Sequence, residues 1–422
     1  MKVGIYTLGC KVNTYESEFV SSLLQNHGYE ICDFKSICDI YIINTCTVTN
    51  TSDIKSRKII RQARKKNKDA CIIAMGCFIQ ADKNNIIKDI DIAIGNKDKS
   101  KIIELIDDYY KNKQKITVIE DNFDNSFEDM MITSYENRTR AFVKIQDGCE
   151  NFCSYCIIPF VRGKCRSKEF NKVIEEIKTL TGNGFKEIGL TGIHTGNYGV
   201  DINSNFASLL REIIKIKDLF RLRISSIEIN ELTDEVLEII KDNDIIVNHL
   251  HIPIQAASDN VLQKMNRKYN LEFYKEKIKR IKTIKKDINI TTDIIVGHPY
   301  EEDIDFSSGI DVIKEIGFSK LHVFPYSRRK DTKSDLMPQV DEKVKKQRAR
   351  KLLELSKELE ISYMKKFLNK ELEVLIEKST DKYSIGHTTN YLNAKIYNKK
   401  YNSGDLVKIT LKDIDYPFII GE

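Results

Sequence analysis

The stretch Gly-Cys-Glu-Asn-Phe-Cys-Ser-Tyr-Cys at residues 148–156 decides the expected fold, because it puts Cys149, Cys153 and Cys156 in one short loop. A β-rich apolar run, Ala141 to Gln146, leads directly into this loop. Three cysteines at this spacing wrap around one metal centre. The sequence therefore predicts a metal site at the carboxyl end of a strand, which is where barrel enzymes keep their ligands.

Further strand candidates follow this loop, and helical patterns separate them. They are Glu187 to Leu190, Arg221 to Ser226, His249 to Ile254, Thr291 to Val296 and Leu321 to Pro325. Ahead of Glu187, the residues Val173, Ile177 and Leu180 share one face of an expected helix. Repetition of strand and helix predicts an incomplete (βα)6 barrel over residues 135–362.

Two more domains are expected to flank this barrel. The earlier strand candidates, which alternate with helical stretches, are Val3 to Leu8, Ile40 to Thr45, Cys71 to Met75 and Ile92 to Ile94. They predict an α/β domain with a parallel sheet at residues 1–112. The polar, acidic residues 113–134 are typical of a linker. Alternating apolar positions after residue 362 predict a small β-barrel at residues 363–422, so the fold class is α/β with a terminal β domain.

Composition excludes several classes of protein. The 422 residues exceed one typical domain, and no apolar run is long enough to cross a bilayer. Because the first residues lack a signal-peptide core, we expect a cytoplasmic protein without a membrane partner. Ten cysteines in that compartment indicate metal or redox chemistry rather than disulfides. The 68 basic and 62 acidic residues differ too little to identify a nucleic-acid partner.

Three cysteines of the first domain, Cys10, Cys46 and Cys77, each follow a β-like run. If those runs are parallel strands of one sheet, their carboxyl ends share an edge and the thiols converge there. The alternative is three unrelated buried cysteines. For the central loop the alternatives are a structural zinc site, with Cys165 as a fourth ligand, and a [4Fe–4S] cluster with one open iron.

The C-x3-C-x2-C loop, with Tyr155 before its last cysteine, resembles the signature of radical S-adenosylmethionine (SAM) enzymes. The resemblance implies that Cys149, Cys153 and Cys156 hold a [4Fe–4S] cluster whose open iron binds SAM and whose reduction releases a 5′-deoxyadenosyl radical. It also implies that Tyr155 lies against the adenine of SAM. Strand ends on the same face supply further candidates for SAM binding, namely Gly192, Ser226, Glu228 and Gln255.

The blocks Thr7-Leu-Gly-Cys-Lys-Val-Asn, Asn44-Thr-Cys and Gly76-Cys resemble the amino-terminal domain of methylthiotransferases. This resemblance implies that Cys10, Cys46 and Cys77 hold a second, auxiliary [4Fe–4S] cluster, and that the terminal barrel is a TRAM-like RNA-binding domain. Together with Cys156-Ile-Ile-Pro-Phe-Val-Arg-Gly-Lys, the blocks are most similar to the branch that acts on tRNA threonylcarbamoyladenosine. The implied reaction adds a methylthio group to C2 of N6-threonylcarbamoyladenosine at position 37 (t6A37), giving ms2t6A37.

Three motifs depart from the family pattern. Gln255-Ala-Ala-Ser, Gly297-His-Pro-Tyr and Asp331-Thr stand where Gln-Ser-Gly-Ser, Gly-Phe-Pro-Gly and Gly-Thr are expected. Rival functions are methylthiolation of isopentenyladenosine-37 in tRNA, methylthiolation of a ribosomal protein, and a non-enzymatic, metal-stabilised RNA-binding protein. A cation such as Arg162 or Lys164 would favour the threonylcarbamoyl carboxylate.

The expected partners are the tRNA anticodon loop around position 37 and an external electron donor, and the expected oligomeric state is a monomer. Residues 55–68 carry eight basic and no acidic side chains, with Ile59, Ile60 and Ala63 on the other face. This pattern predicts a basic-faced helix that meets RNA phosphates. Candidate phosphate contacts of the terminal barrel are Lys378, Lys382, Lys395, Lys399 and Lys400.

Overall fold

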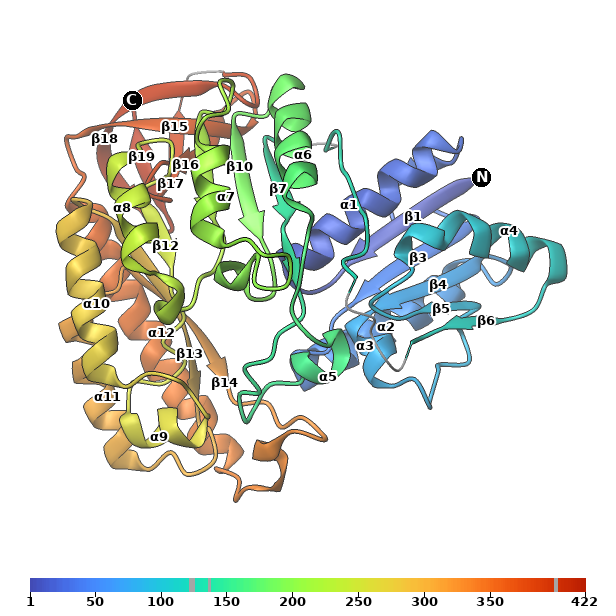
Figure 1. The fold of residues 1–422 in the computed structure, drawn as a ribbon, viewed down its shortest axis with the longest axis horizontal. Helices are drawn as coiled ribbons and strands as arrows, with labels where there is room; N and C mark the ends of the chain where they lie inside the picture. The colour runs from blue at the N-terminus through green and yellow to red at the C-terminus, as the bar shows by residue number, and fades with distance from the viewer. Residues whose placement is uncertain (121–125, 136–137, 398–400) are drawn as a thin grey trace.

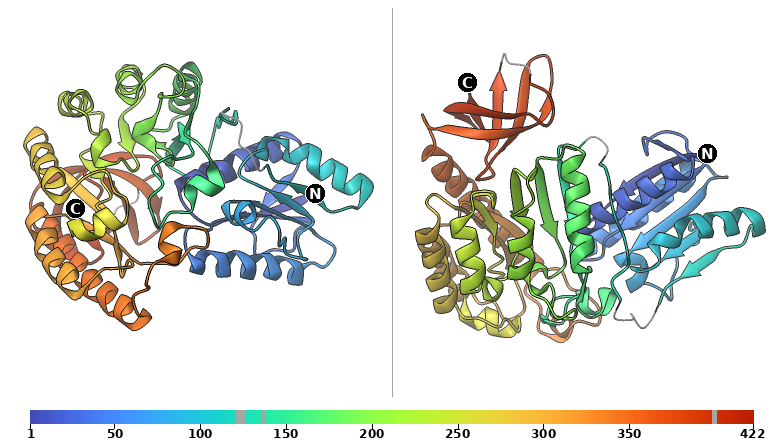
Figure 2. Two further views of the ribbon diagram at one scale, coloured as in Figure 1. Left: turned by 60° about the horizontal axis from the view of Figure 1, so that its bottom comes forward. Right: turned by 45° about the horizontal axis from the view of Figure 1, so that its top comes forward.

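The computed structural model describes residues 1–120, 126–135, 138–397 and 401–422. Figures 1 and 2 show an amino-terminal α/β domain beside a central domain of strands and outer helices, with a small barrel standing on one end of the central strands. Lys399 and Lys400 lie outside the described residues. Across the described residues, none of the helices combines the length and apolar character that crossing a bilayer requires.

The amino-terminal domain is a parallel six-stranded sheet in the order β2-β1-β3-β4-β5-β6. Its strands are β1 (Lys2–Thr7), β2 (Glu30–Cys32), β3 (Ile40–Thr45), β4 (Cys71–Gly76), β5 (Ile92–Ile94) and β6 (Ile116–Val118). Its helices are α1 (Lys11–Asn26), α2 (Asn50–Lys66), α3 (Cys77–Ala81), η1 (Lys99–Lys101) and α4 (Ile102–Asn112). The predicted parallel sheet is confirmed, and β6 continues it into the segment predicted as a linker.

The central domain holds six parallel strands in two three-stranded sheets, β11-β10-β7 and β12-β13-β14, which a bridge between Leu222 and Ile246 connects. These strands are β7 (Arg140–Lys144), β10 (Glu187–Thr191), β11 (Arg221–Ile224), β12 (His249–His251), β13 (Asn289–Val296) and β14 (Lys320–Pro325), and a short pair is formed by β8 (Gln146–Asp147) and β9 (Arg166–Ser167). The predicted incomplete barrel is confirmed, with every predicted strand in place.

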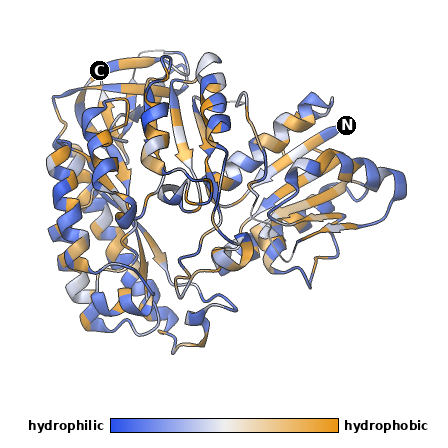
Figure 3. Cartoon of the chain, viewed as in Figure 1, coloured by the Kyte–Doolittle hydropathy of each residue, from blue (hydrophilic) through white to orange (hydrophobic). Residues whose placement is uncertain are grey.

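Most helices of the central domain lie outside its strands, whereas α5 (Ile158–Arg162) lies beside α3 of the first domain (Figure 1). The others are α6 (Phe170–Gly182), α7 (Phe206–Ile213), α8 (Asp234–Asp242), α9 (Asp259–Lys264), α10 (Leu271–Ile284), α11 (Asp303–Ile316) and α12 (Glu342–Lys365), with the short turns η2 (Thr195–Asn197), η3 (Ile229–Glu231) and η4 (Lys333–Leu336). Figure 3 shows their apolar residues in stripes. Val173, Ile177 and Leu180 are buried as predicted, because burial of such a stripe drives a surface helix onto its sheet.

The amino-terminal domain contacts the central domain at both edges of the open barrel, beside β7 and after β14. On one side α1 packs beside β7, where Lys144 pairs with Glu16 at 3.1 Å. On the other side, Arg329 follows β14 and pairs with Asp53 of α2 at 2.8 Å. The first domain therefore covers the gap that six strands leave in the barrel.

The last domain is a closed barrel in the order β15-β16-β17-β19-β18, as predicted. Its strands are β15 (Glu371–Ser379), β16 (Tyr383–Thr388), β17 (Asn393–Tyr397), β18 (Leu406–Asp415) and β19 (Phe418–Gly421). The turn between β16 and β17 places Tyr391 against the amino-terminal ends of the central strands. Its ring centroid lies 4.3 Å from the guanidinium of Arg223, 5.5 Å from that of Arg140 and 4.8 Å from the ring of His249.

Tyr391→Ala is expected to lower the free energy of unfolding by about 2 kcal/mol, because it removes two cation–π contacts and the packing of one ring. Urea denaturation followed by circular dichroism measures the loss. Tyr397→Ala is the matched control, since that side chain is 42% exposed and its removal should cost no more than about 0.5 kcal/mol. Equal losses in the two variants would contradict an anchoring role for Tyr391.

Candidate functional site

The central cysteine loop is held by its own backbone. Cys149 N–H donates to the Gly163 carbonyl at 3.0 Å, and Cys156 N–H donates to Cys153 at 3.0 Å. Gly148 has φ +75°, and a Cβ there would lie 1.8 Å from the Lys164 carbonyl oxygen, so only glycine fits. The loop therefore has one defined path, and all three of its thiols are partly exposed at the end of the central strands.

The three thiols of this loop act on one another electrostatically. Burial, followed by the negative charge of Cys153, raises the pKa of Cys156 to about 12. Within the described residues, no three Cys, His, Asp or Glu side chains are close enough to share one metal ion. Each thiolate of a cubane binds a different iron, so the donor chemistry of three cysteine thiols fits a [4Fe–4S] cluster with one open iron.

Cys165 stands close to this loop and has other partners. Its sulfur accepts from Asn197 Nδ2 at 3.2 Å and lies 3.8 Å from the Gly148 carbonyl oxygen. His194 pairs with Glu231 and lies 3.3 Å from the Asn151 amide. Burial disfavours the charged His194 ring, but hydrogen bonds to Cys149, Cys165 and Glu231 raise its pKa to about 12. A cationic histidine thus lies beside the central thiols.

Arg267 belongs to none of the sequence motifs, yet the structure places it at the same site. Its Nη1 donates to Cys153 Sγ at 3.3 Å, and its Nη2 pairs with Glu228. Together with His194, these residues line a cavity of about 370 Å³. The partners are 114 and 39 positions away from Arg267 in the sequence, so no local motif marks the residue.

The residues predicted to bind SAM fall into three neighbouring cavities. Glu228 lines the cavity beside Cys153, whereas Tyr155 and Gln255 line a second one, of about 230 Å³, together with Cys156. Gly192 and Ser226 line a third and larger cavity. All five therefore lie at strand ends near the central loop, and their contact with SAM stays a prediction.

Two departures from the family motifs coincide with unusual backbone. Tyr300 has φ +67° and Asp331 has φ +68°, both in the left-handed region that favours glycine, and the family pattern has glycine at both positions. The chain therefore keeps the backbone path while it adds side chains there. His298, in the same motif as Tyr300, is buried below the cysteine loop and lies 3.3 Å from Ser154 Oγ.

The amino-terminal thiols come to one edge of their sheet. β3 lies between β1 and β4, with Thr7 opposite Asn44 and Thr45 opposite Gly76. Cys10 follows β1, Cys46 follows β3 and Cys77 follows β4, so all three stand at the carboxyl ends of adjacent strands. Burial, then the charges of Cys77 and Cys10, raise the pKa of Cys46 to about 11. The trio shares one space, and its role as a ligand set stays a prediction.

The asparagines of the sequence blocks tie this edge together. Asn13 Nδ2 donates to Asn44 Oδ1 and to the Thr45 carbonyl, both at 3.0 Å, and Asn44 Nδ2 donates back to the Asn13 carbonyl at 2.9 Å. Cys10 Sγ donates to Asn13 Oδ1 at 3.3 Å. These buried amides fix the loops that carry Cys10 and Cys46.

A buried ion network joins the two cysteine sites. Arg162 is fully buried and donates to Glu16 and to Asp147, each at 3.0 Å. Lys144 lies 3.1 Å from Glu16 and 2.6 Å from Asp147, and Lys99 lies 3.6 Å from Glu16. The sequence predicts that a cation such as Arg162 or Lys164 binds a substrate carboxylate. For Arg162 this prediction is wrong, because the carboxylates of Glu16 and Asp147 already pair with it.

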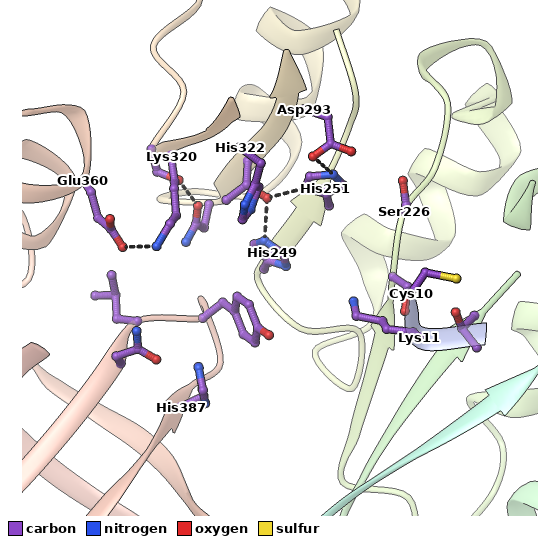
Figure 4. A pocket seen from close by; sticks show the side chains of 18 of the residues that line it. Cys10, Lys11, Ser226, His249, His251, Asp293, Lys320, His322, Glu360 and His387 are labelled. Carbon is purple, nitrogen blue, oxygen red and sulfur yellow. Dashed lines mark hydrogen bonds and ion pairs between the residues drawn. The ribbon is translucent and has the colours of Figure 1, made fainter. Parts of the chain in front are cut away.

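A cavity of about 440 Å³ lies between the three domains (Figure 4). Cys10 and Lys11 come from the first domain, His249, Asp293 and Lys320 from the central strands, and His387 and Tyr391 from the terminal barrel. Lys320 pairs with Glu360 at 2.9 Å, and His251 pairs with Asp293 at 3.2 Å. One exposed thiol of the amino-terminal trio, Cys10, therefore opens into a polar chamber.

Two protein-family models match the chain. The model of the uncharacterized protein family UPF0004 matches residues 2–95, and that of the radical SAM superfamily matches residues 143–312. The chain thus carries a radical SAM domain, whose family uses a [4Fe–4S] cluster and SAM.

Full-length relatives are more specific. The chain is 42% identical to threonylcarbamoyladenosine tRNA methylthiotransferase MtaB of Bacillus subtilis strain 168, over 100% of this chain and 96% of that protein. It is 35% identical to tRNA-2-methylthio-N(6)-dimethylallyladenosine synthase of Clostridium tetani, over 96% and 93%. The radical SAM methyltransferase TsrM of Kitasatospora setae shares the fold, with a TM-score of 0.58, 13% identity and coverage of 76% and 72%. The chain therefore belongs to the family of radical SAM tRNA methylthiotransferases.

Proposed function

We propose that this protein adds a methylthio group to C2 of N6-threonylcarbamoyladenosine at position 37 of tRNA. The 42% identity to a threonylcarbamoyladenosine tRNA methylthiotransferase over the whole chain carries this proposal. The position of Cys10 in the wall of the chamber, with Cys153 and Cys156 in the walls of two other cavities, supports it. We also propose a cytoplasmic monomer that receives electrons from a separate donor protein.

Two cofactor sites follow from the donor sets. Cys149, Cys153 and Cys156 would hold the central [4Fe–4S] cluster, and Cys10, Cys46 and Cys77 would hold the auxiliary one. When bound, the central cluster and SAM supply the radical chemistry that activates the C2–H bond, and the auxiliary cluster supplies a site for the sulfur.

The protein's own residues bind, orient and shield the reactants. The backbone of the Gly148 loop sets the path of the central thiols, and Arg267 places a cation beside Cys153. The network around Arg162 fixes the first domain against the second. Because the terminal barrel contributes to the wall of the chamber, it helps to keep water away from the reacting base.

RNA contacts are proposed for the basic face of α2. Lys55, Lys58 and Arg61 are exposed there and have no ion-pair partner among the described residues, whereas Ile59 and Ile60 are buried as predicted. Together with Lys378, Lys382 and Lys395 of the terminal barrel, this face supplies cations for a phosphate backbone.

Replacing Lys55, Lys58 and Arg61 together by alanine is expected to weaken tRNA binding about tenfold and to reduce the salt slope of log affinity by about two. Fluorescence anisotropy with labelled tRNA over a range of salt measures both. Lys241→Ala on α8 is the control, since that lysine is also exposed and lies on the outside of the central domain. An unchanged salt slope in the triple variant would remove α2 from the RNA interface.

Mass spectrometry of tRNA nucleosides from a deletion strain tests the proposed function. Loss of ms2t6A37 and its return with the cloned gene are expected. Loss of the methylthio group from isopentenyladenosine instead would favour methylthiolation of isopentenyladenosine-37. Unchanged tRNA with an altered ribosomal protein would favour methylthiolation of that protein. Purified protein that contains zinc, lacks iron and does not cleave SAM after reduction would support the non-enzymatic alternative.

A further inference from the structure

Lys11 differs from the other lysine that lines the large chamber. Lys320 is paired with Glu360, whereas Lys11 has no hydrogen bond or ion pair through its side chain among the described residues. Its recorded neighbour is the ring of Phe142, with the centroid 5.9 Å from Nζ. Figure 4 shows Lys11 extending into the chamber from the same loop end as Cys10. A partly buried ammonium without a counter-ion is costly, so the site is suited to an anion that comes from outside the chain.

The carboxylates nearest to Arg140 and Arg223, beside Lys11, are engaged by those arginines. Arg140 pairs with Glu377 at 2.9 Å, Arg223 pairs with Glu187 at 2.8 Å, and these two arginines flank Tyr391. Burial would raise the pKa of Tyr391, but Arg140, Lys11 and Arg223 outweigh it and lower that pKa. Glu377 and Glu187 are therefore occupied by arginines, and neither forms an ion pair with Lys11 in the described structure.

A second polar group in the chamber also lacks a partner. Ser225 lines the cavity, is 7% exposed, and its Oγ makes no hydrogen bond in the structure as described. A buried hydroxyl in that state is expected to bond to a ligand. The chamber, at about 440 Å³, has the size of a small-molecule pocket, and both Lys11 and the buried hydroxyl of Ser225 line it without a partner among the described residues.

We propose that Lys11 binds the carboxylate of the threonylcarbamoyl group and is thereby a specificity-determining residue; this inference rests on the proposed function. The substrate base carries that carboxylate at N6, on the side chain that distinguishes it from an alkylated adenosine. Because Lys11 directly follows Cys10 in the sequence, an anion held by Lys11 ties the base to the amino-terminal trio. An uncharged isopentenyl group gains nothing from this contact.

The test uses the anaerobically reconstituted full-length enzyme and three anticodon stem–loop RNAs. They carry t6A, the methyl ester of t6A, or isopentenyladenosine. The enzymes are wild type, Lys11→Gln, Lys11→Arg and the surface control Lys241→Gln. Iron and sulfide are counted in each preparation, because Lys11 is next to a proposed ligand. Methylthiolation and RNA affinity, the latter by anisotropy, are both measured.

Wild type is expected to lose about 30-fold in kcat/KM when the carboxylate is esterified, as for a hydrogen bond to a charged group. Lys11→Gln should lose about 30-fold on the t6A RNA with unchanged iron, and little on the ester. Lys11→Arg should recover part of the activity on the t6A RNA. RNA affinity should fall for the t6A RNA alone.

Other outcomes overturn the inference. Equal losses by Lys11→Gln on acid and ester would indicate a phosphate contact or a structural role. Wild-type activity on t6A that is insensitive to Lys11→Gln would overturn the role of Lys11 and leave the proposed function standing. If wild type with full iron leaves the t6A RNA unmodified, the proposed function fails, and this inference fails with it.

Discussion

A variant with Cys10, Cys46 and Cys77 all replaced by alanine should hold about four irons per chain after anaerobic reconstitution, against about eight in wild type. It should also lose methylthiolation completely, while it still cleaves SAM after reduction. The reason is that the amino-terminal trio stands at the ends of β1, β3 and β4, in a domain separate from the central loop. Loss of one site therefore leaves the ligands of the other untouched.

Iron and sulfide analysis, with an assay for 5′-deoxyadenosine, measures both effects. Cys32→Ala is the matched control, since this thiol belongs to the same sheet but lies on β2, beside Cys38. It should keep all of the iron. Unchanged iron in the triple variant would remove the second cluster from the account, and loss of all the iron would mean that the two sites do not load independently.

Glu16→Gln should lower the free energy of unfolding by about 3–5 kcal/mol, the cost of removing one partner from a buried ion pair. Glu16 faces Arg162, Lys144 and Lys99 within 3.6 Å, and all four side chains are buried. The amide would leave Arg162 and Lys144 with Asp147 as their carboxylate partner, and Lys99 with the Asn96 carbonyl. Urea denaturation at neutral pH measures the loss.

Glu18→Gln provides the comparison on the same helix. Glu18 pairs with Arg138 at 3.0 Å on the surface, where such a pair contributes about 0–1 kcal/mol. Similar losses in the two variants would contradict a special role for the buried network. A Glu16→Gln protein as stable as wild type would contradict it directly.

The same network predicts a pH dependence. Burial alone would raise the pKa of Glu16, but Arg162, Lys99 and Lys144 lower it to about 2, well below the ordinary glutamate value of about 4.3. A lowered folded pKa adds stability above the unfolded value, and this stability is lost as the pH falls toward 2. The difference between wild type and Glu16→Gln should therefore shrink between about pH 4.5 and pH 2. A difference that does not change with pH would contradict the assignment.

Local patterns in the sequence were sufficient for the framework. β-rich runs precede Cys149, Cys10, Cys46 and Cys77. Because parallel strands end at one edge of a sheet, these runs predict that both cysteine trios lie at strand ends. Short strands could not be predicted in this way. Ile116–Val118 has too few residues to show an alternation of apolar and polar side chains, so this strand lies inside the segment predicted as a linker.

Long-range contacts decide what the sequence could not. Arg162 is a motif residue near the cysteine loop and was expected to be free for substrate, yet Glu16, 146 positions away, occupies it. Lys11 is part of a sequence motif, but the motif does not predict that its side chain lacks a partner. That property depends on how three domains meet around it. Such facts depend on tertiary packing, which no window of sequence reports.

The shared wall of the chamber has a consequence for how this architecture evolves. His387 and Tyr391 of the terminal barrel line the same chamber as Cys10 and Lys11, so this barrel is a structural part of the chamber. A chimera with this barrel from a paralogue would have a differently shaped wall in the chamber where we propose that the target nucleotide binds. Selectivity for the modified base and binding of the tRNA should therefore change together as the family evolves.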